Sequence, residues 1–212
     1  MFDLFVSVFV TLFVVIDPPG VAPVFAAMTE TGSMAWRRRM AVRANLIALL
    51  ILLGFAYGGE WLFSRMGVSL DSFRAAGGVL LFLLALDMLF ENRTKRREDR
   101  VETFKEEHAG EREPEDVSVF PMAIPMIAGP GAIASIMLYM SEARTDWVAQ
   151  SVVLGALISN LAICFVVFFY IGTVMKAIGP TAAAAITRVF GVILAALSAQ
   201  LLLDGLKNTF FS

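Results

Sequence analysis

A single carboxylate interrupts the first apolar run of the chain and stands directly before two prolines and a glycine. Asp17 follows twelve uncharged residues after Leu4 and precedes Pro18, Pro19 and Gly20. A charge at that depth in an apolar segment is costly, so we expect it to face the protein interior or a hydrated cavity. There it can bind a cation or a ligand ammonium, or it can cap the helix that begins after the prolines. The two roles are compatible, and the sequence leaves both open.

A second stretch rich in proline and glycine lies in the other half of the chain. Proline removes a backbone donor and glycine allows non-helical geometry, so we expect the helix to break there and a new one to start. The N–H groups at such a start attract a carboxylate. The half-helix that begins near Pro19 is expected to do the same. The second stretch contains Pro121, Pro125, Gly129, Pro130 and Gly131.

Composition indicates what surrounds these residues. The chain has 212 residues, 58% of them hydrophobic and 17% charged, with a mean hydropathy of +0.75. A soluble domain carries about a quarter charged residues. Seven basic and ten acidic residues fall within 91–117. These features exclude a soluble enzyme, a nucleic-acid binder and a disordered protein. They indicate a lipid-embedded body with one aqueous segment. Without a nucleotide, metalloprotease or hydrolase motif, we expect no enzyme, metal site or cofactor.

Six runs are long enough to cross a bilayer, which takes about 20 apolar residues. They are roughly 4–28, 42–63, 73–90, 119–140, 147–175 and 182–203. The expected fold is an all-α polytopic membrane protein with six transmembrane helices, the first and fourth broken near mid-membrane. Thirteen Lys and Arg follow spans one, three and five, against four on the other side. The positive-inside rule then predicts that both termini lie outside and that segment 91–117 lies in the cytoplasm.

The positions of the two breaks suggest an internal repeat. Residues 78–87 can be laid on residues 191–200 without a gap, which sets Asp87 opposite Gln200. Because each half has three spans, the halves must be inverted, as in many secondary transporters whose broken helices form a midplane site. The predicted units are 1–90 and 118–212, joined by the loop 91–117. Further approximate pairs are Arg74 with Arg188 and Asn45 with Asn160.

The charged segment 91–117 is interpreted as a solvated linker, in part helical, because it has too few apolar side chains to fold alone. Asp87, near the cytoplasmic end of the third span, is either a cation or proton site or an interfacial residue that pairs with Lys95 or Arg93. Gln200 can coordinate polar groups of a substrate.

Several motifs together resemble the MarC family of bacterial and archaeal inner-membrane proteins. They are DPPGVAPVF at 17–25, RAAGGVLLF at 74–82 with ALDML at 85–89, PMAIPMIAGPGAI at 121–133, and RVFG at 188–191 with Gln200 and LDG at 203–205. The resemblance covers nearly the whole chain. It implies transport or export of small neutral amino acids such as alanine and glycine, and a loose relation to LysE-type exporters. The motif positions that carry over are Asp17, Pro18, Gly20, Pro23, Arg74, Asp87, Pro125, Gly129, Pro130, Gly131, Arg188 and Gln200.

We therefore expect a secondary transporter of small neutral amino acids, coupled to Na⁺ or H⁺. Asp17 would bind the ammonium or the coupling cation, the amides of 129–132 would bind the carboxylate, and Asp87 or Gln200 would assist. The candidates for coupling or gating are Asp87, Arg74, Arg188, Asn45 and Asn160. The expected partners are the amino acid, the lipid bilayer and a second copy in a homo-oligomer. The alternatives are a non-transporting membrane assembly protein and an exporter of drugs or other small hydrophobic solutes.

Overall fold

The described part of the chain is built of helices joined by short connections. The computed structural model describes residues 1–107 and 116–211, and these contain no β-strand. The predicted all-α class is therefore confirmed. The helices are α1 (Phe2–Ile16), α2 (Pro18–Met28), α3 (Met34–Met66), α4 (Leu70–Leu89), α5 (Asn92–Glu107), η1 (Ser118–Ile127), α6 (Pro130–Glu142), α7 (Trp147–Phe169), α8 (Ile171–Ala177) and α9 (Gly179–Phe211).

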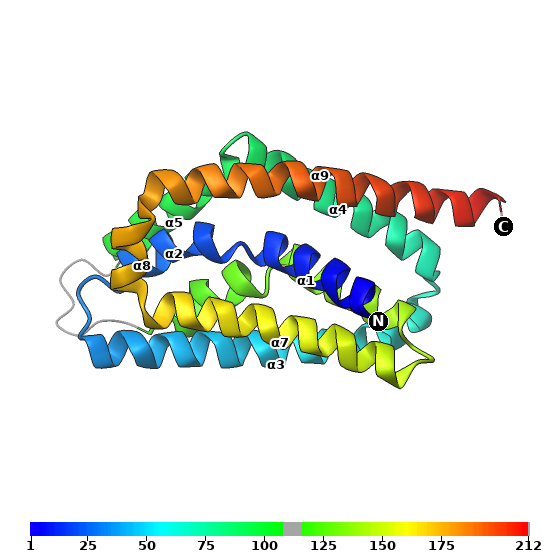
Figure 1. Ribbon diagram of the computed structural model, residues 1–212, viewed down its shortest axis with the longest axis horizontal. Helices are drawn as coiled ribbons and strands as arrows, with labels where there is room; N and C mark the ends of the chain where they lie inside the picture. The colour runs from blue at the N-terminus through cyan, green and yellow to red at the C-terminus, as the bar shows by residue number, and fades with distance from the viewer. Residues whose placement is uncertain (108–115, 212) are drawn as a thin grey trace.

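Long apolar segments run between the two ends of the molecule. Both chain termini lie at one end, and α5 and α8 lie at the other (Figure 1). Together with the bent pair η1–α6, whose axes differ by 58°, these segments match the six predicted spans. The segments that are long and apolar enough by themselves are Phe2–Met28, Met34–Gly59, Leu70–Leu89, Trp147–Phe169 and Gly179–Phe210.

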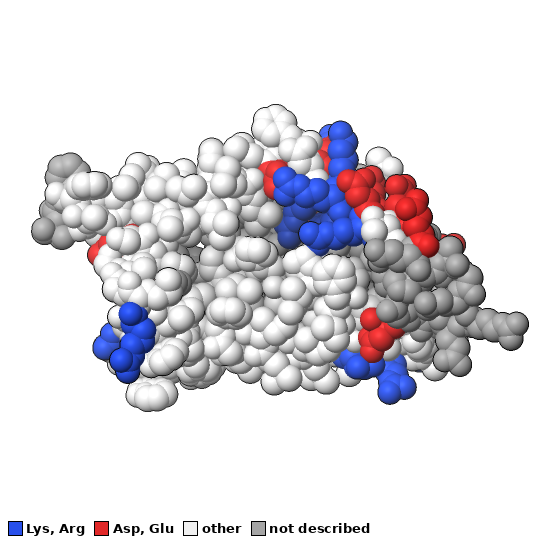
Figure 2. Space-filling model, turned by 180° about the vertical axis from the view of Figure 1, so that it is seen from behind, with Lys and Arg blue, Asp and Glu red and all other residues white. Residues whose placement is uncertain are grey.

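The surface is divided in the way that a bilayer requires. Figure 2 shows a broad face without charged side chains, bordered by Lys, Arg, Asp and Glu at its two ends. An apolar belt between charged ends fits a protein that spans the hydrocarbon core, where charges are costly.

The first span breaks at Asp17, as predicted. Asp17 adopts the left-handed conformation (φ 58°, ψ 62°), which few residues other than glycine tolerate. Pro18 follows it and has no N–H to continue the hydrogen-bond ladder of α1. The result is one helix that ends at Ile16 and a second that begins at Pro18.

The fourth span breaks at Gly129, which precedes α6. Phe120 and Ile124 in η1 adopt extended backbone angles because each stands before a proline, which disfavours helical geometry. Ala128 caps the end of η1. Gly129, with φ −78° and ψ 170°, is the N-cap residue of α6. The two predicted breaks are therefore both present.

Helices α4 and α9 pack against each other in opposite directions through glycines. A side chain at Gly78 would meet the backbone of Leu202 at 2.6 Å and that of Ser198 at 2.9 Å. A side chain at Gly191 would meet the carbonyl of Ala85 at 3.1 Å. The predicted alignment of 78–87 with 191–200 makes these contacts reciprocal, since Ser198 is the counterpart of Ala85. A twofold relation between the halves requires such reciprocity, and the repeat itself stays a prediction.

The segment after α4 differs from the solvated linker predicted for 91–117. Glu91 adopts a left-handed conformation (φ 61°) and turns the chain, and α5 then packs against α2 and α4. Arg97 is 5% exposed and Val101 is 9% exposed, so one face of α5 is buried. The expectation of partial helix is confirmed by α5, whereas the expectation that the segment is solvated was wrong for one face of this helix, because Arg93, Arg97 and Val101 recur every four residues. Residues 108–115 lie outside the described residues.

Candidate functional site

Asp17 is fully buried at the break of the first span. Its side chain is 0% exposed. The amide of Gly20 donates to its Oδ1 at 3.1 Å, so the carboxylate caps α2. The hydroxyl of Thr187 in α9 donates to the same carboxylate at 3.0 Å. Arg97 Nη1 forms an ion pair with Oδ2 at 2.8 Å. The break is thus joined to α9 and to the charged helix α5.

At the first break, the structure shows partners within the protein where the sequence analysis expected a substrate or a cation. The start of α2 was expected to offer its N–H groups to a substrate carboxylate, but Asp17 itself accepts from Gly20. Asp17 was expected to bind a ligand ammonium or a coupling cation, but Arg97 already supplies its counter-charge. The capping role is confirmed.

Gly20 is required by the close packing of this cluster. A Cβ atom at this position would overlap Asp17 Oδ2 and Thr187 Oγ1 and would lie 2.5 Å from Arg97 Nη1. The glycine therefore lets α5 and α9 reach the carboxylate. Its presence in the motif has a steric explanation.

Arg97 has an unused donor group beside the cluster. Its Nη1 binds Asp17, whereas its Nη2 is buried and finds no hydrogen-bond partner in the described part of the chain. A buried donor without a partner costs about 1–3 kcal/mol, and more when it carries charge. Arg97 also lines two pockets, one between α4, α5 and α6 and one between α2, α5 and α9.

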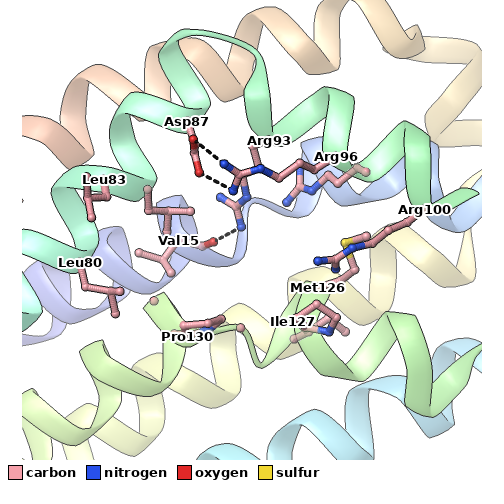
Figure 3. Close-up of a pocket in the computed structure, with 16 residues that line it drawn as sticks. Val15, Leu80, Leu83, Asp87, Arg93, Arg96, Arg100, Met126, Ile127 and Pro130 are labelled. Carbon is pink, nitrogen blue, oxygen red and sulfur yellow. Dashed lines mark hydrogen bonds and ion pairs between the residues drawn. The ribbon is translucent and has the colours of Figure 1, made fainter.

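The first of these, the arginine pocket, contains the break of the fourth span. Its volume is about 330 Å³. Figure 3 shows Arg93, Arg96 and Arg100 on one side and Met126, Ile127 and Pro130 on the other. Figure 2 shows a patch of Lys and Arg side chains toward the end that holds α5. The pocket is lined by Val15, Leu80, Leu83, Leu84, Asp87, Arg93, Arg96, Arg97, Arg100, Pro125, Met126, Ile127, Gly129, Pro130, Gly131 and Ala132.

Asp87 supplies the negative charge at the rim of the arginine pocket. Arg96 Nη1 and Nη2 donate to its two carboxylate oxygens at 2.7 and 3.1 Å. The prediction that Asp87 pairs with Lys95 or Arg93 was wrong, because the turn at Glu91 brings Arg96 back over the end of α4. The pair is partly open to solvent, with Arg96 64% and Asp87 23% exposed. An ion pair this exposed contributes little free energy, so a cationic ligand group can replace Arg96 at Asp87 at little cost.

Arg93 adds a second guanidinium beside Arg97. Its Nη2 donates to the carbonyl of Val15 at 2.7 Å, near the end of α1. Burial lowers the pKa of the Arg93 guanidinium to about 9, and the positive charge of Arg97 acts in the same direction. The carboxylates of Asp17 and Asp87 oppose this shift. The two arginines therefore repel each other, and an anion placed between them would relieve that repulsion.

The start of α6 forms part of the same pocket. Gly129 precedes the helix and, among the described residues, no side chain caps it. The first N–H groups of a helix have no partner inside it and carry the positive end of its dipole. Gly129, Pro130, Gly131 and Ala132 all line the arginine pocket. The predicted helix start at the second break is present and faces the guanidinium groups.

Gln200 lies elsewhere, contrary to the expectation that it assists at the broken helices. It is thirteen residues beyond Thr187, which is about 20 Å along α9. It donates to Asp204 at 2.9 Å and lines a different pocket of about 420 Å³, here called the terminal pocket, at the end of the molecule that holds the termini. Arg74 lines it too and is paired with Glu142 at 2.7 Å.

The other predicted candidates have partners other than Asp17. Arg188 forms an ion pair with Glu91 near the start of α9. Asn45 is buried in α3 and donates to the carbonyl of Ala41 in its own helix. Asn160 is fully buried in α7 and donates to the carbonyl of Phe9 at 3.1 Å, so it joins α7 to α1.

Arg97, Arg93 and Thr187 were not among the residues predicted for the site. The four-residue spacing of Arg93, Arg97 and Val101 could have indicated a buried face of α5. Thr187, a small polar residue one position before the motif residue Arg188, gives no comparable indication. Within the described residues, no three His, Cys, Asp or Glu side chains gather as a metal site would need.

The arginine pocket can recognise an oxyanion and, at Asp87, a cationic group. Its four arginines outnumber Asp87 and the Asp17 carboxylate behind Arg97 by two charges. Guanidinium groups and free helix amides are the usual partners of carboxylates and phosphates. Leu80, Leu83 and Leu84 supply an apolar wall for the remainder of a small solute.

Comparisons with known proteins identify relatives along the whole chain. It is 33% identical to a UPF0056 membrane protein of Methanocaldococcus jannaschii, over 96% of both chains. A UPF0056 membrane protein of Bacillus subtilis is 32% identical over 99% of this chain and 97% of its own, and one of Aquifex aeolicus is 32% identical over 97% and 93%. These names describe membrane proteins and give no substrate or enzymatic activity. No solved structure matches the chain. The family model described as "MarC family integral membrane protein" matches residues 2–210, and the chain belongs to that family.

Proposed function

We propose that the protein is a secondary transporter of small neutral amino acids such as alanine and glycine, driven by a gradient of Na⁺ or H⁺. The observation that carries the proposal is the arginine pocket, where a carboxylate, several guanidinium groups and the free start of α6 meet at a broken span. An amino acid zwitterion needs one group of each sign at its two ends. Broken helices that meet within the membrane are typical substrate sites of secondary transporters.

The proposed contacts assign one group to each end of the substrate. Asp87 receives the ammonium, because Asp17 is held by Arg97 and Asp87 is paired only at the exposed rim. The N–H groups at the start of α6 and Arg97 receive the carboxylate. The short side chain of alanine then lies against Leu80, Leu83 and Leu84.

The terminal pocket supports a pathway across the membrane. In the predicted repeat, Leu84 and Asp87 correspond to Leu197 and Gln200. The first pair lines the arginine pocket and the second pair lines the terminal pocket, near the opposite end of the helices. Inverted repeats exchange such positions when a transporter opens to the other side. The two pockets would then be alternate openings of one route.

Flux of labelled alanine in proteoliposomes tests this function. Wild-type protein should accumulate alanine when a gradient of H⁺ or Na⁺ is imposed, and Asp87→Asn should reduce that flux at least tenfold because it removes the ammonium contact. Asp99→Asn is the matched control, since Asp99 is exposed on α5 and lies outside the pocket lining. It should leave flux unchanged.

Two other outcomes would overturn the proposal. A wild-type protein without gradient-dependent flux of any small neutral amino acid would favour the non-transporting assembly protein. Flux of hydrophobic drugs without flux of alanine would favour the drug exporter.

A further inference from the structure

We propose that the arginine pocket contains a binding site for a single oxyanion, held by Nη2 of Arg97, the guanidinium of Arg93 and the N–H groups of Gly131 and Ala132 at the start of α6. As the anchor of a substrate carboxylate, the site rests on the proposed function. As a site for any oxyanion, it does not depend on the proposed function, because it is inferred only from charge, burial and hydrogen bonding.

The first argument is the unsatisfied donor of Arg97. The residue is 5% exposed and its Nη1 is fixed by Asp17 at 2.8 Å, so the guanidinium has little freedom to seek water. Nη2 remains without a partner among residues 1–107 and 116–211. A guanidinium presents its donors in a planar fork, and a carboxylate or phosphate fills the vacant side of that fork.

The second argument is the local excess of positive charge. Asp17 balances the charge of Arg97, one of the two neighbouring guanidinium groups. In the contacts given for the described residues, Arg93 donates only to neutral groups, which are the carbonyl of Val15 and the sulfur of Met88. One bound negative charge would neutralise the pair. Two like charges held close together repel each other, and an anion between them offsets part of that cost.

The third argument is the helix start that faces these arginines. Helix α6 has 13 residues and no side-chain cap in the described structure, and Gly129, Pro130 and Gly131 line the pocket that Arg97 lines. A side chain at Gly131 would meet Leu84 at 2.8 Å and Val15 at 2.9 Å. The glycine therefore keeps the backbone of α6 close to α1 and α4.

The oxyanion can come from a soluble molecule or from a lipid. Leu80 and Leu83 line the pocket and are 40% and 56% exposed on the spanning helix α4, so the pocket borders the bilayer as well as the aqueous end. A carboxylate in solution and the phosphodiester of an anionic phospholipid share the chemistry that these groups recognise. The experiment below separates the two sources.

Binding to the full chain in phosphatidylcholine nanodiscs tests the soluble source. Calorimetry at constant ionic strength should detect alanine or acetate, and alaninamide, which lacks the carboxylate, should bind at least tenfold more weakly. Phosphatidylglycerol retained by the protein in native mass spectrometry tests the lipid source. Binding from either source supports the site. It is overturned if neither binds, or if alaninamide matches alanine and no phosphatidylglycerol is retained.

Two variants assign the binding to Arg97. Arg97→Lys keeps a positive charge for Asp17 but removes the second nitrogen of the fork, so oxyanion binding should weaken at least tenfold. The double variant Asp17→Asn with Arg97→Gln removes both charges together and avoids a buried unpaired carboxylate; it should show the same loss. Arg39→Gln, an exposed arginine outside the pocket lining, is the control and should bind like wild type. Unchanged binding in both Arg97 variants would overturn the assignment.

These measurements separate the site from the transport function. Binding without flux would refute transport and leave the oxyanion site standing. Alanine flux without detectable oxyanion binding from either source would refute the site and leave transport standing.

Discussion

At the scale of single residues, the central feature is a buried ion pair between elements far apart in the sequence. Asp17 and Arg97 are 80 positions apart and nearly inaccessible to solvent. Removal of one partner from such a pair leaves an uncompensated buried charge, which typically costs about 3–5 kcal/mol. The pair is therefore a constraint on the fold, and it also determines which atoms of Arg97 remain available to a ligand.

Gly20→Ala tests whether this cluster needs a close approach of the backbone. The added methyl would overlap the groups on Asp17 and Thr187 that bind each other, so we expect a loss of about 1–3 kcal/mol, or roughly 2–12 °C in apparent Tm. Thermal unfolding in detergent measures it. Gly155→Ala in α7, which has no neighbouring atom within 4 Å, is the control. An equal Tm for the two variants would contradict the steric role of Gly20.

At the scale of helices, the breaks were predictable because their causes are local. Proline and glycine act on the backbone within one turn, so Asp17–Pro18 and Gly129–Pro130 can be located from the chain alone. The packing of α5 was not predictable in that way. It depends on the turn at Glu91 and on a carboxylate contributed by another helix. Composition alone predicts that segment 91–117 is solvated, because it is rich in charge, and most of the charged side chains of α5 are indeed exposed.

This contrast between local and long-range causes also explains which residues of the candidate site could be predicted. Residues at the breaks were correctly located, whereas Gln200 was assigned to the Asp17 site through a sequence alignment that contains no distances. The structure places Gln200 at the other end of α9. An inverted repeat would in fact separate Asp87 from Gln200, because equivalent positions then lie on opposite sides of the membrane.

The crossing of α4 and α9 gives a prediction at this scale. Gly78→Ala would place a methyl 2.6 Å from the backbone nitrogen of Leu202, and a backbone atom cannot rotate away. The two helices must separate, so we expect a lower Tm, again by roughly 2–12 °C. Gly77→Ala, one residue earlier in α4 with no atom within 4 Å, should gain up to about 1 kcal/mol from helix propensity. If both variants melt above wild type, the close crossing is not required for stability.

At the scale of the whole molecule, the paths of the helices constrain the topology. The termini share one end, and α5, α8 and the connection between α2 and α3 share the other (Figure 1). Arg37, Arg38 and Arg39 follow that connection, so they lie at the same end as the arginines of α5. The positive-inside rule uses such an excess of Lys and Arg at one end, and it predicts that this end lies in the cytoplasm.

Cysteine labelling tests this orientation with little background. Cys164 is the single cysteine, and its side chain is fully buried in α7, so wild-type protein should not react with a membrane-impermeant maleimide. Thr31→Cys places a thiol on the exposed connection between α2 and α3, and Thr145→Cys places one on that between α6 and α7. In intact cells Thr145→Cys should label and Thr31→Cys should label only after permeabilisation. The reverse pattern would place α5 and the arginine pocket outside the cell, and the ligand would then have to approach from there.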